Sequence, residues 1–236
     1  MRTLYIYSLI LITHTVIGQD LTTYLDDVDK FLATHVKNGL VDYKAIHKDQ
    51  VQLDNLLESA SLISISASDA DRYQAFWINT YNIAVIKGII DNYPIKSPLD
   101  KKGFFDKTTY NLGRKSITLN TIENDLLRKK FNDPRVHFVL VCGANGCPPL
   151  ISKAYRPSTL DVQLNTQTKK AINGNFIKVN SRKKTIEVSE IMKWYRVDFV
   201  QNGTTEIDFI NAYRNEKLSN DYSIGYFSYD WSLNKQ

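Results

Sequence analysis

The chain has 236 residues, of which 43% are hydrophobic, 23% charged and 11% aromatic. These proportions are those of an ordinary globular protein, and they exclude a disordered or fibrous chain. Ten glycines and six prolines are too few for a low-complexity linker, and no internal stretch has the roughly 18 consecutive apolar residues of a membrane-spanning helix. We expect a single globular domain over residues 19–236.

The first 18 residues have the pattern of a secretory signal peptide. Arg2 supplies a positive charge, an apolar run covers residues 4–12, and Gly18 precedes the expected cleavage site. The alternative is an uncleaved anchor helix, which the polar residues 13–15 interrupt. Residues 1–18 therefore predict export to the periplasm or secretion, with no transmembrane anchor after cleavage.

The formal net charge is +5, from 30 Lys and Arg against 25 Asp and Glu. The basic residues are scattered, and pairs such as Lys129-Lys130 are typical of a solvated surface, so we expect no nucleic-acid partner. The two cysteines, Cys142 and Cys147, lie in the part that we expect to be exported, where thiols meet an oxidising environment. A disulfide between them is therefore an alternative to any catalytic role.

Three helices are predicted in the first part of the chain. The spacing of apolar residues predicts helices over residues 20–36 and 49–60. A third helix follows Ser68, which with Asp71 resembles a capping pair. Its residues up to Ile90 are apolar nearly all round, so we expect this helix at the centre of the domain.

The remainder of the chain mixes hairpins, helices and one strand. Asn120 and Glu123 are expected to form a capping box, and the apolar run Arg135–Cys142 predicts a buried strand. This pattern indicates an α+β fold, a helix-rich single domain around a small, mostly antiparallel sheet. Hairpins are predicted over residues 109–119 and 176–188, and helices over residues 121–131, 158–172, 189–201 and 204–215.

The segment from His137 to Leu150 is the most unusual, because the predicted strand leads into a glycine-rich loop with two cysteines. A thiol beside a histidine is the minimal cysteine nucleophile, since the imidazole takes the thiol proton. In a regular strand Cys142 points away from His137, whereas the loop could bring Cys147 back toward it. Cys147 is therefore the candidate nucleophile and His137 the candidate base. The alternative, which the residues alone favour, is a Cys142–Cys147 disulfide with His137 hydrogen-bonded in the core.

A zinc site made of His137, Cys142 and Cys147 is conceivable, but the expected strand geometry opposes it. No Cys-x-x-Cys or His-x-x-x-His spacing occurs. The glycine-rich loops of ATP and NAD sites and the Gly-x-Ser-x-Gly elbow are also missing. We therefore expect no metal and no cofactor.

Four further residues could complete a catalytic site. Glu123 could orient the histidine or act as a general acid or base, although a capping box also explains it. Asn79 and Asn82 share one face of the central helix, where their amides could serve a substrate or oxyanion or could satisfy backbone groups. We take Asn79 as an orienting group and Asn82 and Trp77 as substrate-binding residues. Lys193 and Asp198 are expected to be surface charges or to pair with each other.

Several short motifs occur together in chain order. They are Phe76–Asn82, Ile122-Glu123, Leu127-Arg128, Asp133–Phe138, Cys142-Gly143, Cys147–Leu150, Ala154-Tyr155, Lys193–Tyr195 and Asp198-Phe199. Each is weak alone, and the combination is specific. From about residue 40 to the C-terminus the chain resembles the domain of unknown function 547 family.

The resemblance implies little about activity, because the family is largely uncharacterised. The Cys and His content suggests a distant similarity to papain-like or transglutaminase-like cysteine hydrolases, without a motif match. Where the family usually reads Ile-Glu-His, this chain has Ile122-Glu123-Asn124. If that histidine takes part in the chemistry, this member is impaired or only binds.

Two hypotheses follow. The first is an exported cysteine-dependent hydrolase that cleaves a peptide or amide bond in a small peptide-like ligand, with Cys147 as nucleophile, His137 as base, and Asn79 or Glu123 as orienting group. The second is a non-catalytic binding or scaffold domain of the cell envelope with a structural Cys142–Cys147 disulfide. The positions of the Cys147 sulfur and the His137 ring separate the two.

Overall fold

The computed structural model describes residues 20–201 and 203–236. The predicted signal peptide, residues 1–18, lies outside the described residues. About half of the chain is helical and 13% is in strands, which confirms the α+β class. No helix in the described part of the chain is both long enough and apolar enough to cross a membrane.

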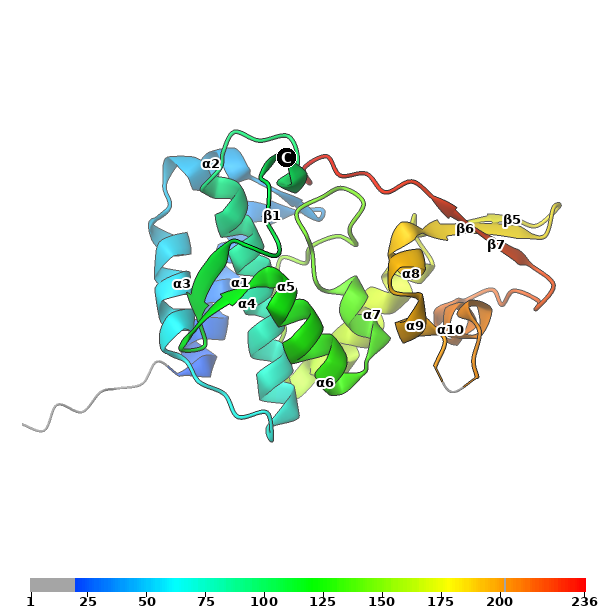
Figure 1. Cartoon of the computed structure of the whole chain (residues 1–236), viewed down its shortest axis with the longest axis horizontal. Helices are drawn as coiled ribbons and strands as arrows, with labels where there is room; N and C mark the ends of the chain where they lie inside the picture. The colour runs from blue at the N-terminus through cyan, green and yellow to red at the C-terminus, as the bar shows by residue number, and fades with distance from the viewer. Residues whose placement is uncertain (1–19, 202) are drawn as a thin grey trace, which may run out of the picture.

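The buried centre of the N-terminal part is α4 (Ala70–Ile90), as its apolar pattern predicts, and sixteen of its 21 residues are buried. Its N-cap is Asp69, whose carboxylate accepts a hydrogen bond from the Arg72 amide, so the predicted cap at Ser68 is wrong by one residue. The predictions for residues 20–36 and 49–60 are confirmed. The helices that contact α4 on this side are α1 (Leu21–His35), α2 (Tyr43–Lys48) and α3 (Val51–Leu62) (Figure 1).

The described strands form three small sheets instead of one. Both predicted hairpins are present and antiparallel. The last strand was not predicted; it pairs in parallel with a strand more than 30 residues earlier, which no local turn signal marks. The pairs are β1 (Val36–Lys37) with β2 (Leu40–Val41), β3 (Thr109–Leu112) with β4 (Lys115–Thr118), and β5 (Ile177–Asn180) with β6 (Thr185–Ser189), which also pairs with β7 (Ser223–Phe227).

The remaining helices are short, and two predicted helices are interrupted. The predicted helix 121–131 consists of α5 (Leu119–Thr121), a π-helical stretch η2 (Ile122–Arg128) and α6 (Lys129–Phe131). The predicted helix 189–201 divides into α8 (Glu190–Trp194) and α9 (Arg196–Phe199). The other elements are η1 (Pro98–Asp100), η3 (Pro134–Phe138), η4 (Pro157–Thr159), α7 (Leu160–Ile172) and α10 (Glu206–Tyr213).

The segment Arg135–Cys142 is not the strand that its apolar run predicts. Pro134 opens the 3₁₀ turn η3, and Asp133 caps it by accepting a hydrogen bond from the Arg135 amide at 2.9 Å. Beyond η3 the chain runs irregularly to Leu150. Burial on all sides produces the same apolar run as a buried strand, so the pattern alone could not separate them. The alternation of side chains along a strand therefore does not apply here, and the prediction that it makes Cys142 point away from His137 is wrong.

Two asparagine side chains of α4 form hydrogen bonds with the backbone of this irregular segment, which pairs with none of the described strands. Asn82 donates a hydrogen bond to the Val139 carbonyl (3.0 Å) and accepts one from the Val141 amide (2.9 Å). Asn79 donates to the Tyr155 carbonyl (2.8 Å) and accepts from the Tyr155 amide (3.0 Å). The chain between these contacts, which carries both cysteines, is thereby fixed to α4 at each end.

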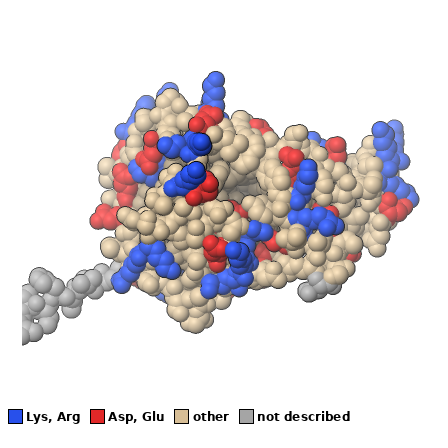
Figure 2. Space-filling view, in the orientation of Figure 1, with Lys and Arg blue, Asp and Glu red and all other residues tan. Residues whose placement is uncertain are grey.

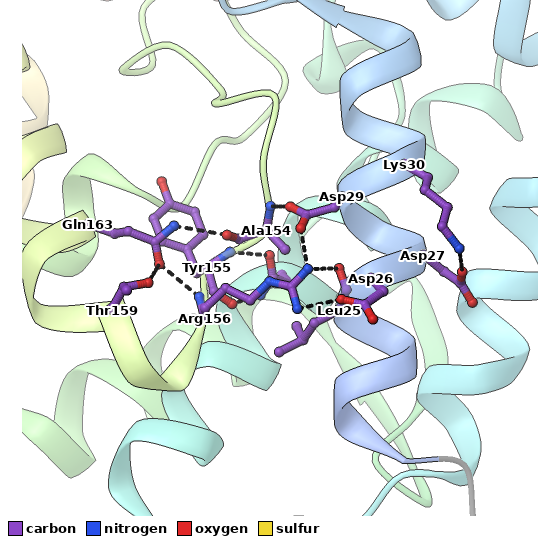
Figure 3. Close-up of polar contacts among 11 residues, drawn as sticks. Leu25, Asp26, Asp27, Asp29, Lys30, Ala154, Tyr155, Arg156, Thr159 and Gln163 are labelled. Atoms are coloured by element: carbon purple, nitrogen blue, oxygen red, sulfur yellow. Dashed lines mark hydrogen bonds and ion pairs between the residues drawn. The ribbon is translucent and has the colours of Figure 1, made fainter.

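Arg156 ties the same segment to α1, as Figure 3 shows. Its guanidinium points toward the helix and pairs with Asp26 at 2.6 Å and with Asp29. It also donates to the Leu25 carbonyl, while the Ala154 amide donates to Asp29. The end of the cysteine-bearing segment therefore rests between α1 and α4.

The apolar interior has two clusters, one centred on α4 and one between the β5–β7 sheet and α8–α10. The C-terminal tail, residues 229–236, crosses from the second to the first and ends near β1 and β2 (Figure 1). On the way it accepts hydrogen bonds from the amides of Gly146 (to Asp230) and Asn145 (to Ser232), both at 2.8 Å. The tail therefore contacts the cysteine-bearing segment in the stretch of chain that lies between its two asparagine contacts with α4.

We expect Asn82→Ala to lower the free energy of unfolding by at least about 2 kcal/mol, because the Val139 carbonyl and Val141 amide would each lose a buried partner. Urea unfolding followed by circular dichroism measures the change. Asn55→Ala, on the exposed face of α3, is the matched control and should shift stability by less than about 0.5 kcal/mol. If both variants lose equally little, the amide does not hold this segment.

Candidate active site

A cavity of about 260 Å³ lies between the two apolar clusters. It brings together three of the residues predicted for the site, namely Cys147, His137 and Glu123. Figure 2 shows that the surface is hollowed near the middle of the molecule. The complete lining is Tyr81, Phe105, Asn120, Glu123, His137, Leu140, Cys142, Cys147, Ile191, Trp194, Tyr195, Tyr229 and Trp231.

Cys147 lies at the end of a tight turn in which its amide donates to the Ala144 carbonyl at 3.1 Å. Its sulfur accepts a hydrogen bond from the Cys142 amide at 3.0 Å and lies 2.8 Å from the Tyr229 hydroxyl. Burial alone would raise the pKa of the Cys147 thiol, but the contacts with Cys142 and Tyr229 outweigh burial and lower this pKa. The thiolate, which is the nucleophilic form, is therefore favoured at this sulfur.

Cys142 has the opposite electrostatic environment. Its sulfur lies 2.9 Å from the same Tyr229 hydroxyl, and the contact with Cys147, together with burial, raises the pKa of its thiol well above the usual value. Burial, reinforced by both cysteines, also raises the pKa of Tyr229, so its phenol stays protonated and can donate. Both cysteines are free thiols, so the structure lacks the disulfide of the alternative hypothesis.

Gly146 allows the Tyr229 ring to come this close. A Cβ at Gly146 would lie only 2.7 Å from the ring, a distance that side chains essentially never adopt. The residue next to Cys147 therefore has to be glycine if the hydroxyl is to reach both sulfurs.

His137 is held by Asp198, a residue that the sequence did not mark as catalytic. The ring nitrogen Nε2 lies 2.6 Å from Asp198 Oδ2, and the ring stacks on Tyr195 with centroids 4.1 Å apart. His137 lines the cavity, and no hydrogen bond of its Nδ1 is described within residues 20–201 and 203–236. Because the Asp198 carboxylate accepts the proton at Nε2, a neutral imidazole carries its lone pair on Nδ1.

Arg128 is the second partner of Asp198. Its Nε donates to the same carboxylate oxygen at 2.7 Å, and its guanidinium lies over the Tyr195 ring at 4.4 Å. Burial would raise the pKa of Asp198, but the hydrogen bonds and charges of His137 and Arg128 overcome burial and lower it to about 2. The carboxylate is therefore ionised at neutral pH and fixes the orientation of the imidazole.

Glu123 lines the cavity and does not cap a helix. The cap is Thr118, whose hydroxyl accepts a hydrogen bond from the Thr121 amide at 3.1 Å, so the predicted Asn120–Glu123 capping box is wrong. Glu123 lies instead in the π-helical η2, and such stretches are frequent at functional sites. Its carboxylate accepts a long hydrogen bond of 3.4 Å from the Tyr81 hydroxyl. No described hydrogen bond joins Glu123 to His137, so the orienting role falls to Asp198.

Asn79, Asn82 and Trp77 lie outside the cavity lining. Both asparagine amides are used by backbone groups, which was the second interpretation that their sequence allowed. Trp77 is 3% exposed and packs edge-on against Phe76 in the core. The structure therefore gives these three residues structural contacts and does not bring them to Cys147.

Asp198 and Tyr229 belong to the site but were not predicted as site residues. Asp198 lies within one of the family motifs, which could have identified it, and its described partners are Arg128 and His137 instead of the expected Lys193. Nothing in the sequence around Tyr229 marks it, because its role depends on how the tail crosses the cysteines. Within residues 20–201 and 203–236, no group of three or more His, Cys, Asp or Glu side chains is placed to hold a metal ion.

Comparison with known proteins agrees with the motif resemblance. Residues 65–172 match the family model described as "Protein of unknown function, DUF547". This segment belongs to the DUF547 family. It contains Glu123, His137 and both cysteines, whereas Asp198 and Tyr229 lie beyond it. No curated protein and no solved structure matches the chain.

We expect Asp198→Asn to destabilise the protein by about 2 kcal/mol at neutral pH. Folding lowers the pKa of Asp198 from 3.8 to about 2, so its charge stabilises the fold above about pH 4, and this stabilisation is lost as the pH falls through about 2. Urea unfolding at several pH values should show the difference between wild type and variant shrinking toward pH 2.

Asp161→Asn is the control for this measurement, because Asp161 pairs with Arg135 while its side chain is 75% exposed. Its effect should stay below about 1 kcal/mol. A wild-type advantage over Asp198→Asn that is the same at every pH would contradict the assigned charge.

We expect iodoacetamide to label Cys147 of the DUF547 segment faster than Cys142 at neutral pH, because the contacts lower the pKa of the first thiol and raise that of the second. Peptide mass spectrometry locates the adducts. Tyr229→Phe removes the hydroxyl from both sulfurs and should shift the pH midpoint of Cys147 labelling upward, whereas Tyr222→Phe should leave it in place. Equal labelling rates at the two cysteines would rule out a selectively activated thiol.

Proposed function

We propose that this protein is a cysteine-dependent hydrolase of a peptide or amide bond. The observation that supports it most directly is the placement of Cys147 and an Asp198-oriented His137 on one cavity. A nucleophile, a base and a group that orients the base are the parts that thiol hydrolysis requires. The same division of labour occurs in papain-like hydrolases, the chemical analogy suggested by the Cys and His content.

In the proposed first step the Cys147 thiol gives its proton to Nδ1 of His137, and the sulfur attacks the carbonyl carbon of the amide. The C–N bond breaks, and the leaving nitrogen takes that proton from His137. In the second step water attacks the thioester while His137 accepts a proton from it. The C–S bond then breaks and the departing sulfur takes that proton back from His137, which releases the carboxylic acid and restores the thiol and the neutral imidazole. Asp198 stays ionised throughout and stabilises the imidazolium that forms in each step.

A second cavity supports a ligand that extends on both sides of the thiol. Cys147 also lines a cavity of about 430 Å³, whose walls include Pro148, Phe176 and Phe227 together with the charged Lys170 and Asp230. A bond that is cleaved at Cys147 would therefore have room for substituents in two directions. This arrangement suits a small peptide-like ligand better than a compact metabolite.

The position where the family usually has histidine does not prevent this chemistry. Asn124 lies outside the cavity lining, and its side-chain oxygen accepts a hydrogen bond from Arg128. Arg128 in turn holds Asp198, the partner of His137. Asn124 therefore contacts Asp198 only through Arg128. His137 is oriented by Asp198 and needs no second histidine for this purpose.

The proposal includes export to the periplasm or secretion, which rests on the signal-peptide pattern of residues 1–18. Both cysteines are free thiols here, and the Tyr229 hydroxyl contacts each sulfur.

Hydrolysis of a panel of fluorogenic peptide amides tests the proposal. We expect Cys147→Ala and His137→Ala each to lower kcat/KM by at least about 10³-fold, because each removes a group that takes part in the bond-breaking steps. Cys142→Ala is the matched control and should retain activity within about tenfold of wild type. Activity that survives in Cys147→Ala would refute the proposal, and a wild type that binds these peptides without cleaving them would favour the binding-domain alternative.

A further inference from the structure

Among the residues that the structure describes, Glu123 is the only carboxylate that lines the cavity, and no Lys or Arg lines it. None of the ion pairs among the described residues includes Glu123, although neighbouring acidic side chains such as Asp125 and Asp198 are paired. Its described side-chain partners are the neutral hydroxyls of Tyr81, at 3.4 Å, and Tyr195, and neither carries a positive charge. A carboxylate that faces a half-closed cavity without a cation is an available counter-charge for a ligand.

The surrounding wall is aromatic. Trp194 and Trp231 stack with centroids 5.9 Å apart, and the Tyr229 ring lies 4.7 Å from that of Trp231. Phe105 extends this group from the opposite side, 6.4 Å from Trp231. Aromatic faces attract cations and exclude water, so they strengthen the attraction between a carboxylate and an ammonium group.

The alternative roles of Glu123 are weaker. It does not cap its helix, and it does not orient His137, which Asp198 already does. Burial and the charge of Glu123 raise the pKa of Tyr81, so this hydroxyl remains a neutral donor and leaves the negative charge of Glu123 uncompensated. An anionic ligand would meet repulsion from Glu123, and the described lining has no Lys or Arg side chain to offset it.

We propose that the cavity selects a ligand in which an ammonium group adjoins an aromatic or apolar group, with the ammonium paired to Glu123 and the apolar part against Trp194 and Trp231. The inference deepens the proposed function, since such a ligand would be the amine-bearing part of the substrate cleaved at Cys147. The selectivity for positive charge belongs to the cavity itself and can be measured without turnover.

Binding to Cys147→Ser, which cannot form the thioester, tests the inference. The probe is phenethylamine, with 2-phenylethanol and phenylacetate as neutral and anionic counterparts of similar shape, and Trp fluorescence or calorimetry reports affinity. We expect phenethylamine to bind at least about tenfold more tightly than 2-phenylethanol, and phenylacetate to bind most weakly. Equal affinities for the amine and the alcohol, or a preference for phenylacetate, would overturn the inference.

Two further variants separate the contributions in the same background. Glu123→Gln should abolish the preference for the amine while a thermal unfolding curve shows that the fold is kept, and Glu58→Gln, an exposed carboxylate of α3, should not change it. Trp194→Ala, at a side chain that is 45% exposed, should weaken amine binding at least about fivefold. An unchanged preference in Glu123→Gln overturns the inference.

The outcomes distinguish this inference from the proposed function. Amine binding without hydrolysis of any amide by wild type would refute the hydrolase and keep the ammonium site. Hydrolysis confined to neutral or acidic substrates would keep the hydrolase and refute the ammonium site.

Discussion

The pair of hydrogen bonds between Asn82 and the backbone at Val139 and Val141 is the constraint on which the site depends. The segment that carries both thiols is buried, yet it has neither helical nor sheet partners over most of its length. Buried peptide groups need partners, and a side-chain amide offers one donor and one acceptor in the same spacing as a peptide unit. Asn79 repeats the arrangement at Tyr155, so one rigid helix defines where the intervening loop begins and ends.

The site is formed where two separately packed parts of the chain meet. The α4 side contributes Glu123 and, through the fixed segment, His137 and the cysteines, whereas Asp198 and Tyr229 come from the second cluster and the tail. Neither part has the complete site. The first has His137 without Asp198, and the second has the Tyr229 phenol without the two sulfurs that it contacts. Relative placement of the two parts therefore controls the electrostatics of Cys147 as directly as the residues beside it do.

Local periodicity was sufficient to predict α1, α3, α4 and both hairpins, because their patterns arise from one exposed face or from all-round burial. It failed for Arg135–Cys142, where an apolar run reflects burial of irregular chain and Pro134 starts a turn. Cys147, His137 and Glu123 were identifiable as candidate site residues from their chemistry and proximity in sequence. Local pattern could not reveal the contacts of Asp198 and Tyr229, which join residues 61 and 82 positions apart; only a family motif marked Asp198, and no signal marked Tyr229.

The long separation between Cys147 and Tyr229 also has a consequence for biosynthesis. When Cys147 is added to the growing chain, Tyr229, whose phenol stabilises its anionic form, is still 82 residues from being made. At about 5–20 residues per second that interval lasts roughly 4–16 s. During translation the sulfur is therefore an ordinary thiol, and its reactivity arises only when the last part of the chain settles over it. The contact with Tyr229 that favours the anionic form of Cys147 is therefore missing while the chain is still unfolded.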